Sequence, residues 1–238
     1  MLKPPTPLKR ISVILVVALL LFVLYQFSFL VRVLWFNFYN PSSSAVMRQT
    51  LAQLRQDNPS AQLVFEWADY DQISNQLKRA VISSEDANFL EHQGVEWDAI
   101  RSAWEYNKKQ AAQGSDKRRG GSTLTQQLAK NLFLSSSRSY SRKGQELILS
   151  YMIETVMSKQ RILELYLNIA QWGQVDFGAQ AAAHRYYQTT ANNLSAAQAA
   201  RLAAMLPNPV FYEKKGNTAY LQRRTNTILQ RMRQVSIP

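Results

Sequence analysis

The chain has 238 residues, enough for one globular domain and an additional segment, and it contains no cysteine. Disulfides and thiolate metal sites are therefore excluded, and the two histidines, His92 and His184, cannot form a zinc site alone. The formal net charge of +12 favours an anionic partner, such as nucleic acid, acidic lipid or a phosphorylated substrate.

The N-terminal region predicts a membrane anchor. Residues 11–31 carry no charged side chain and are almost wholly apolar, and a helix of this length spans ~30 Å, the thickness of a hydrocarbon core. The run is longer than the apolar part of a signal peptide and lacks a convincing cleavage site, so we expect it to be retained. Lys3, Lys9 and Arg10 precede it, which predicts a cytoplasmic N-terminus and excludes nucleic acid as the partner of the remaining chain.

These features divide the chain into a basic tail (1–10), an anchor (11–31), a juxtamembrane segment with a linker (32–60) and a main domain (61–238). Trp35, Phe36, Phe38 and Tyr39 predict an aromatic belt at the outer membrane interface. Within the juxtamembrane segment we expect a linker at 40–44 and a helix over 45–55, and residues 63–67 suggest an extended segment.

A first group of chemically active residues follows a predicted helix. Ser74 is a plausible N-cap, and the apolar residues after it predict a helix that delivers Glu85 at its C-terminal end. At helical spacing, Glu85, Phe89 and His92 would share one face. Glu85 would then lie where a core meets a cleft, a position that suits proton transfer, although a solvated acid at a helix end fits the spacing alone.

The next stretch combines a helix, a loop and a second helix. An amphipathic helix is predicted over 97–106, and the polar, basic run 107–119 predicts a mobile loop that either links or handles substrate. Two glycines with Ser122 as a cap would leave free N–H groups at the next helix, which favours phosphate. On that helix Thr123, Gln127 and Lys130 share a polar face, opposite an apolar face of three leucines.

This stretch contains two motifs, Glu85-Asp86-x-x-Phe89-x-x-His92-x-Gly94 and Gly120-Gly121-Ser122-Thr123-x-Thr-Gln-Gln127-Leu-x-Lys130-Asn131. Both resemble motifs of the peptidoglycan glycosyltransferases, which polymerise lipid II into glycan strands. Three further runs extend the resemblance over about residues 75–232: Arg142-Lys143-x-x-Glu146, the segment 159–168, and Arg223-Arg224 with the apolar residues after it. Ser150 stands where the family has alanine. The penicillin-binding transpeptidase motifs are absent, so we expect the monofunctional biosynthetic form.

The later motifs are more ambiguous. The helix after Glu146 is apolar nearly all round, which indicates burial or partial immersion in a membrane, and Arg142 with Glu146 also fits a purely structural i, i+4 pair. The segment 159–168 predicts an amphipathic helix with a structural role. Helices are also expected over 179–187 and from a capping box at Ser195 to residue 206. Arg223 and Arg224 either brace the fold or face the cleft.

The resemblance implies a mainly α fold: a lysozyme-like helical head at 61–238, with a smaller hydrophobic membrane-associated lobe, preceded by one transmembrane helix. It implies inverting transfer from a lipid-linked donor to the 4-hydroxyl of lipid II, with release of undecaprenyl pyrophosphate. Lipid II, the growing strand and the membrane would be its partners, with other cell-wall synthesis and division proteins as further candidates. The expected location is the inner membrane, with the catalytic domain in the periplasm.

In that reaction Glu85 would be the general base, since an alcohol needs a base to become a nucleophile. Glu146 would lie near the donor pyrophosphate, where it either orients cations or holds a divalent ion, Mg²⁺ or Mn²⁺. Lys130 and Arg138 would stabilise developing negative charge, and Thr123 and Gln127 would donate hydrogen bonds. The remaining candidate substrate-binding residues are Asp86, Phe89, His92, Gly121, Ser122, Asn131 and Arg142.

Two other functions remain open from the sequence. A lysozyme-like lytic enzyme would share the fold and a catalytic glutamate, but it would not need the Lys130 and Arg138 cations because it binds no pyrophosphate. A membrane-anchored basic scaffold would explain the charge, but it would leave the Glu85 and Gly120-Gly121 motifs without a purpose.

Overall fold

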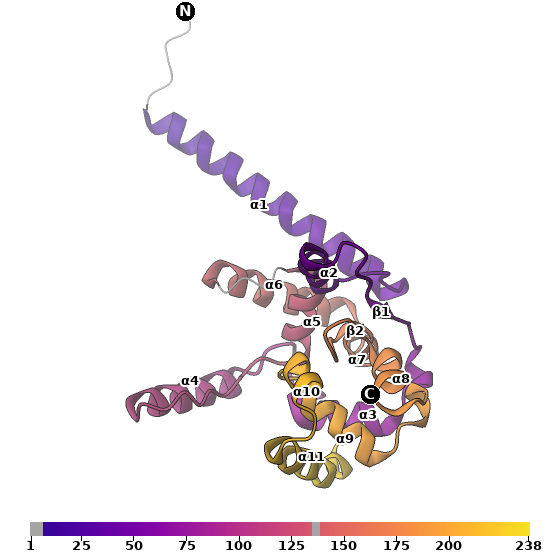
Figure 1. The fold of residues 1–238 in the computed structure, drawn as a ribbon. Coiled ribbons are helices and arrows are strands. Elements are labelled where there is room, and N and C mark those ends of the chain that lie inside the picture. Colours follow the sequence, from indigo (N-terminus) through magenta and orange to yellow (C-terminus); the bar gives the residue numbers. More distant parts are fainter. Residues whose placement is uncertain (1–6, 135–138) are drawn as a thin grey trace, which may run out of the picture. The chain divides into compact units, whose positions relative to one another are not determined.

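The computed structural model describes residues 7–134 and 139–238, so Lys3 and Arg138 lie outside the described residues. The chain divides into two compact units, one up to Asn40 and one from Pro41 onward. The first contains one long helix, α1 (Pro7–Phe38; Figure 1). Its stretch Arg10–Phe38 is long and apolar enough to cross a membrane, by length and composition. α1 continues beyond the predicted apolar run 11–31, and most of the predicted aromatic belt therefore lies on the helix.

The second unit is mainly helical, as predicted. In the part of the chain that the structure describes it contains helices α2 (Ala45–Asp57), α3 (Asn75–Glu85), α4 (Trp97–Ala112), α5 (Leu124–Phe133), α6 (Tyr140–Val156), α7 (Lys159–Ile169), α8 (Ala179–Tyr187), α9 (Ala196–Met205), α10 (Pro209–Lys215) and α11 (Ala219–Arg231). Three short 3-10 helices cover Tyr70–Gln72, Ala191–Asn193 and Met232–Gln234. Strands β1 (Val64–Phe65) and β2 (Asp176–Phe177) form a parallel pair, so the predicted extended segment is confirmed over two residues.

Two groups of helices form the core of the second unit. Helix α5 packs against α2, α6 and α7, whereas α3 packs against α9 and α11. The three leucines of the predicted apolar face of α5, Leu124, Leu128 and Leu132, are all buried. Ile162 and Leu165 of α7 are fully buried as well, which supports the structural role predicted for that segment. The glutamate-bearing end of α3 and the glycine-rich entry to α5 are therefore each held by a packed core.

Helices α3 and α9 start at their predicted caps. The Ser74 hydroxyl accepts a hydrogen bond from the Gln76 N–H at the start of α3, and Ser195 forms the predicted capping box of α9 with Gln198. Helix α9 ends at Met205, one residue before the predicted end at residue 206. Pro209 does more than end a helix, since it occupies the first turn of α10, where its missing N–H costs nothing.

The predicted shared helical face of Glu85, Phe89 and His92 is wrong. Helix α3 ends at Glu85, and the chain then forms turns through residue 94. The reason is tertiary: the Asp86 carboxylate accepts hydrogen bonds from His92 and from the backbone of α5, and these contacts replace another helical turn.

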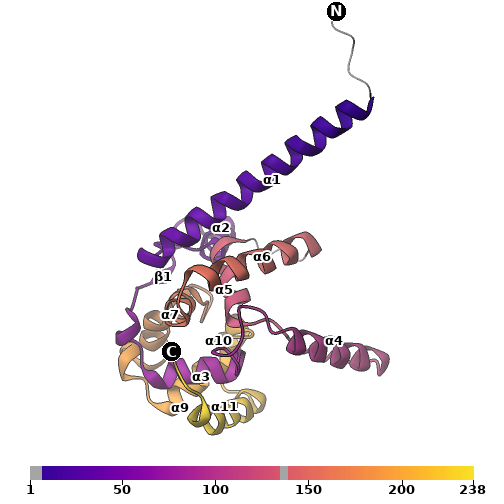
Figure 2. The same ribbon diagram turned by 180° about the vertical axis from the view of Figure 1, so that it is seen from behind.

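The predicted loop over 107–119 is also partly wrong, because α4 continues to Ala112. Lysine, glutamine and alanine are good helix formers, so a polar composition did not prevent a helix here. Figures 1 and 2 show α4 extending away from the other helices of the second unit. The non-helical stretch after α4 returns to it, since the Arg119 N–H donates to Asn107 Oδ1 at 2.8 Å. The predicted mobility of this stretch stays a prediction.

Candidate active site

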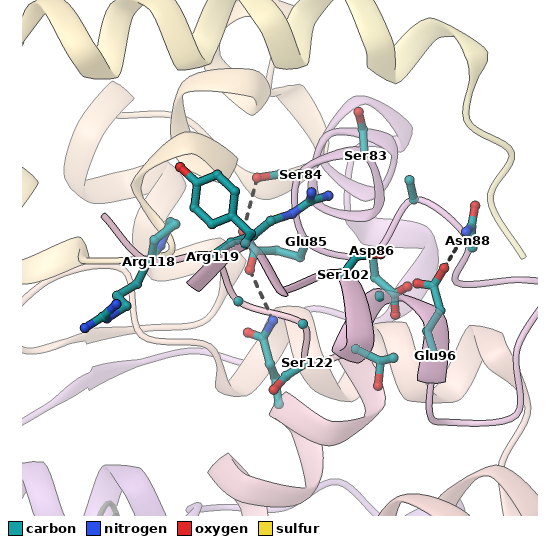
Figure 3. Close-up of a pocket in the computed structure, with 18 of the residues that line it drawn as sticks. Ser83, Ser84, Glu85, Asp86, Asn88, Glu96, Ser102, Arg118, Arg119 and Ser122 are labelled. Atoms are coloured by element: carbon teal, nitrogen blue, oxygen red, sulfur yellow. Dashed lines mark hydrogen bonds between the residues drawn. The ribbon is translucent and has the colours of Figure 1, made fainter. Parts of the chain in front are cut away.

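A cavity of about 930 Å³ lies in the second unit, between the end of α3 and the glycine-rich segment before α5 (Figure 3). Parts of α4, α10 and α11 complete its wall. Six predicted site residues line it: Glu85, Asp86, Gly121, Ser122, Thr123 and Gln127. The structure therefore brings the first two motifs together around one space, although more than twenty residues separate them in sequence.

The Glu85 carboxylate is held by hydrogen-bond donors from two sides of the cavity. Its Oε1 accepts from the Ser84 hydroxyl at 3.1 Å, and its Oε2 accepts from the Gln127 amide at 3.1 Å. Both contacts appear as dashed lines in Figure 3. Arg224 of α11 lies 3.6 Å from Oε1 and forms an ion pair with it. Every one of these partners presents a proton or a positive charge to the carboxylate, so both of its oxygens are held in place.

Gln127 is itself oriented by a buried tyrosine. The Tyr166 hydroxyl of α7 donates to Gln127 Oε1 at 3.1 Å, which turns the amide NH₂ group toward Glu85. Burial raises the pKa of Tyr166 well above its usual value, and the charges of Glu85 and Asp86 raise it further. Tyr166 therefore stays a protonated donor, and it fixes which end of the amide faces the carboxylate.

Asp86 joins the turn after α3 to the start of α5. Its Oδ2 accepts from the Leu124 N–H at 2.8 Å, and the carboxylate also accepts from His92 Nε2 at 2.9 Å. The Gly94 N–H donates to His92 Nδ1 at 3.1 Å, so the imidazole carries its proton on Nε2 and donates it to Asp86. Asp86 and His92 thus form one connected hydrogen-bond network behind the cavity.

The predicted cap of α5 is wrong by one residue. Thr123, not Ser122, is the N-cap, and its hydroxyl accepts from the Gln126 N–H while donating to the Gly94 carbonyl at 2.6 Å. The Leu124 N–H donates to the Asp86 carboxylate. These two N–H groups of α5 therefore have side-chain partners, and phosphate binding by the glycine-serine segment before the helix stays a prediction.

Phe89 and Gly94 support the site from behind and do not line the cavity. Phe89 is fully buried, with the Lys159 ammonium 4.6 Å from the centre of its ring. Gly94 has φ of +86°, and a Cβ there would lie 2.8 Å from the side chain of Glu154. Only glycine fits this backbone conformation and this close approach to α6.

A second charged cluster lies on α6. The Glu146 carboxylate, nearly fully buried, accepts from Arg142 at 2.9 Å and from the Lys143 ammonium. Lys143 also donates to the Ser122 hydroxyl at 3.1 Å. The Arg142–Glu146 pair exists, as the structural alternative predicted, and Lys143 links it to the glycine-rich segment that lines the cavity.

Lys130 interacts electrostatically with both carboxylates. Burial lowers its pKa below the usual value of 10.5, the charge of Glu146 raises it, Arg142 and Lys143 lower it, and Glu85 raises it. Lys130 on α5 therefore interacts both with Glu85 and with the charged cluster of α6. Arg142 and Lys143 form ion pairs with the buried Glu146 carboxylate, and the charge of Lys130 interacts with it from α5.

The two oxygens of Glu146 already have cationic partners, since Arg142 and Lys143 donate to them. Among the described residues, no group of three or more His, Cys, Asp or Glu side chains converges as a metal site. The expected divalent ion at Glu146 stays a prediction.

Comparison with known proteins is informative at this point. A family model described as Transglycosylase matches residues 49–233. The chain belongs to this family. It is 61% identical over 230 residues to the biosynthetic peptidoglycan transglycosylase of Bordetella pertussis, covering 97% of this chain and 95% of that protein. A protein of the same name from Janthinobacterium sp. is 53% identical over 230 residues, which is 97% of this chain and 98% of that protein. Another from Methylobacillus flagellatus is 51% identical over 224 residues, which is 94% of this chain and 96% of that protein.

Membership in the transglycosylase family confirms the resemblance read from the motifs. It does not test the individual residues. Asn131 is half-buried on α5 and does not line the cavity, and Arg138 lies outside the described residues. Substrate binding by these two, and by Phe89, His92 and Arg142, stays a prediction.

Four residues at the transglycosylase site were not among the predicted site residues: Ser84, Lys143, Tyr166 and Arg224. Lys143 and Tyr166 belong to the third and fourth motifs, so a residue-by-residue reading of those motifs could have selected them. Nothing local in the sequence marks Ser84. Arg224 was left undecided, and the structure places it in the wall of the cavity.

Proposed function

We propose that the chain is a monofunctional peptidoglycan glycosyltransferase that polymerises lipid II. Transfer would occur to the 4-hydroxyl of an acceptor sugar with inversion, and undecaprenyl pyrophosphate would leave. The observation that carries the proposal is the pairing of two features joined by the glycine-rich segment: Glu85, which faces the cavity with donors at its two oxygens, and a cation cluster of Lys130, Arg142 and Lys143, which Lys143 links to Ser122 of the cavity wall.

Glu85 suits the role of general base. The acceptor hydroxyl must lose a proton as it attacks the donor carbon, and Glu85 faces the cavity where an acceptor could lie. Its hydrogen bonds from Ser84 and Gln127 keep the carboxylate in one orientation. The new bond joins the acceptor oxygen to the donor carbon, the bond from that carbon to the pyrophosphate oxygen breaks, and the proton passes to Glu85.

The cation cluster suits the leaving group. Pyrophosphate leaves with its bonding electrons and needs positive charge rather than a proton donor. Lys130 and Lys143 come from two helices that meet beside the glycine-rich segment, and Glu146 holds Lys143 and Arg142 in place. A lytic enzyme would instead need a protonated acid for its sugar leaving group, and it would have no pyrophosphate to use this cation cluster.

The test is to incubate the purified full-length protein in detergent with labelled lipid II, and in parallel with finished peptidoglycan. We expect polymer from lipid II and no soluble fragments from peptidoglycan. Cleavage of peptidoglycan without polymerisation of lipid II would replace the proposal with the lytic alternative. A protein with neither activity would point to the scaffold.

We also propose that α1 is a single-pass anchor in the inner membrane, with the N-terminus in the cytoplasm. The apolar stretch Arg10–Phe38 supports the anchor, and the basic residues before it support the orientation. Trp97 and Trp104 of α4 and Tyr151 of α6 are exposed, which fits the expected hydrophobic lobe at the membrane surface. An association with other cell-wall synthesis and division proteins stays a prediction.

The orientation predicts the behaviour of reporters fused after Pro238. A reporter that is active only outside the cytoplasm should give signal, whereas one that is active only in the cytoplasm should not. The same two reporters fused before residue 10 should give the reverse pattern. Activity of the cytoplasmic reporter at the C-terminal fusion would overturn the orientation, and with it access to a periplasmic substrate.

A further inference from the structure

Arg224 reaches the catalytic cavity from the C-terminal part of the chain. Helix α11 packs against α9 and α3, and this packing places the Arg224 guanidinium over the end of α3. Its Nη2 donates to the Ser84 hydroxyl at 3.0 Å and lies 3.6 Å from Glu85 Oε1. The neighbouring Arg223 is exposed and does not line the cavity.

We propose that Arg224 is a positioning residue for the general base, acting on Glu85 directly and through Ser84. The proposal rests on the proposed function, in which Glu85 accepts the proton. It gives α11 a part in the reaction without contact between Arg224 and the substrate.

The hydrogen-bond directions support this role. Ser84 Oγ accepts from the Arg224 guanidinium, which has no acceptor atom, so the single Ser84 hydrogen is free to donate. Two acceptors compete for that hydrogen: Glu85 Oε1 at 3.1 Å and the Ala203 carbonyl at 3.4 Å. The shorter contact and the carboxylate charge favour Glu85. Arg224 thus helps to hold Oε1, while Gln127 holds Oε2.

The charges around Glu85 come from four elements. Asp86 follows it in the turn, Lys130 faces it from α5, Tyr166 from α7 and Arg224 from α11. Tyr166 is neutral, Asp86 repels the Glu85 carboxylate, and both cations attract it. Arg118 and Arg119 also line the cavity. Loss of Arg224 removes the cation in ion-pair contact with Glu85 and the guanidinium that holds Ser84.

The experiment compares Arg224→Ala with the adjacent, exposed Arg223→Ala. For Arg224→Ala, kcat on lipid II should fall about 10–100-fold, as for loss of one hydrogen bond to a charged group, with little change in KM. Arg224→Lys should recover part of the rate because it restores the charge, and Ser84→Ala should lower kcat in the same way by less. Arg223→Ala should match the wild type.

A second measurement is independent of activity. Glu85 can be followed by NMR in protein labelled with ¹³C at glutamate side chains, with Glu85→Gln used to assign its signal. At a fixed pH, the Glu85 side-chain signal should lie at a different position in Arg224→Ala than in the wild type or Arg223→Ala. An unmoved signal and an unchanged kcat in folded Arg224→Ala would overturn the positioning role. A moved signal in a protein that does not polymerise lipid II would support the positioning contact and overturn the proposed function instead.

Discussion

Glu85→Gln should abolish polymerisation of lipid II while leaving the fold intact. Glutamine keeps the shape of the side chain, and its oxygen can still accept from Ser84, but it cannot take a proton from the acceptor hydroxyl. A positioned general base contributes about 10²–10⁴ in rate, so we expect a loss in that range, measured as initial rate with labelled lipid II. The effect should fall on kcat, because the cavity wall is otherwise unchanged.

Glu91→Gln is the matched control for this prediction. Glu91 lies in the turn that follows the base and is exposed, so the same chemical change there should leave the rate unaltered. The thermal unfolding midpoints of both variants should stay close to that of the wild type. Near-normal turnover by a folded Glu85→Gln protein would remove Glu85 from the role of base.

Lys130→Ala should be the second most damaging change. Lys130 is the cation on α5 that interacts with both the base and the α6 cluster, and its loss removes a charge-assisted contact to the leaving pyrophosphate. Such a contact contributes ~1.5–3 kcal/mol, which corresponds to about a 10–100-fold loss of kcat/KM. A phosphate-containing inhibitor should also bind more weakly. Arg138→Ala, outside the described residues, is expected to act in the same direction.

Lys109→Ala serves as the control, because Lys109 is an exposed lysine on α4. It should polymerise lipid II and bind the inhibitor as the wild type does. If Lys130→Ala and Arg138→Ala are as active as Lys109→Ala, the cations do not serve the leaving group, and the preference for synthesis over lysis loses its chemical basis.

The pH dependence gives a further check on Lys130. Since burial lowers the pKa of Lys130 below 10.5, the free enzyme should lose this charge as the pH rises, at a lower pH than for an exposed lysine. The kcat/KM of the wild type should therefore begin to fall at a lower pH than loss of the charge of an exposed lysine would give. Lys130→Arg keeps its charge at these pH values, so if the variant is active, its alkaline limb should move to higher pH. If the alkaline limb of kcat/KM does not move in an active Lys130→Arg variant, a group other than Lys130 causes the loss of activity at high pH.

Local patterns in the sequence determined the elements and much of the chemistry. The apolar run before residue 31, the caps at Ser74 and Ser195, and the apolar face of α5 depend on residues within one or two turns of each other, so their periodicity and propensity sufficed. The position of Glu85 at the end of a helix was predictable for the same reason. The motifs around Glu85 and Gly121 also identified the family, which the comparisons confirm.

The contacts that turn these residues into a site depended on the tertiary structure. Asp86 caps α5 across 38 positions of sequence, and Arg224 reaches Ser84 across 140. Such pairings follow from how α3, α5 and α11 pack, and no local periodicity encodes them. The same physics explains the error after Glu85: the contacts of the Asp86 carboxylate with His92 and with the start of α5 replace another turn of α3. A buried charge must find partners wherever the fold brings them, so its partners are decided by packing and not by neighbours in sequence.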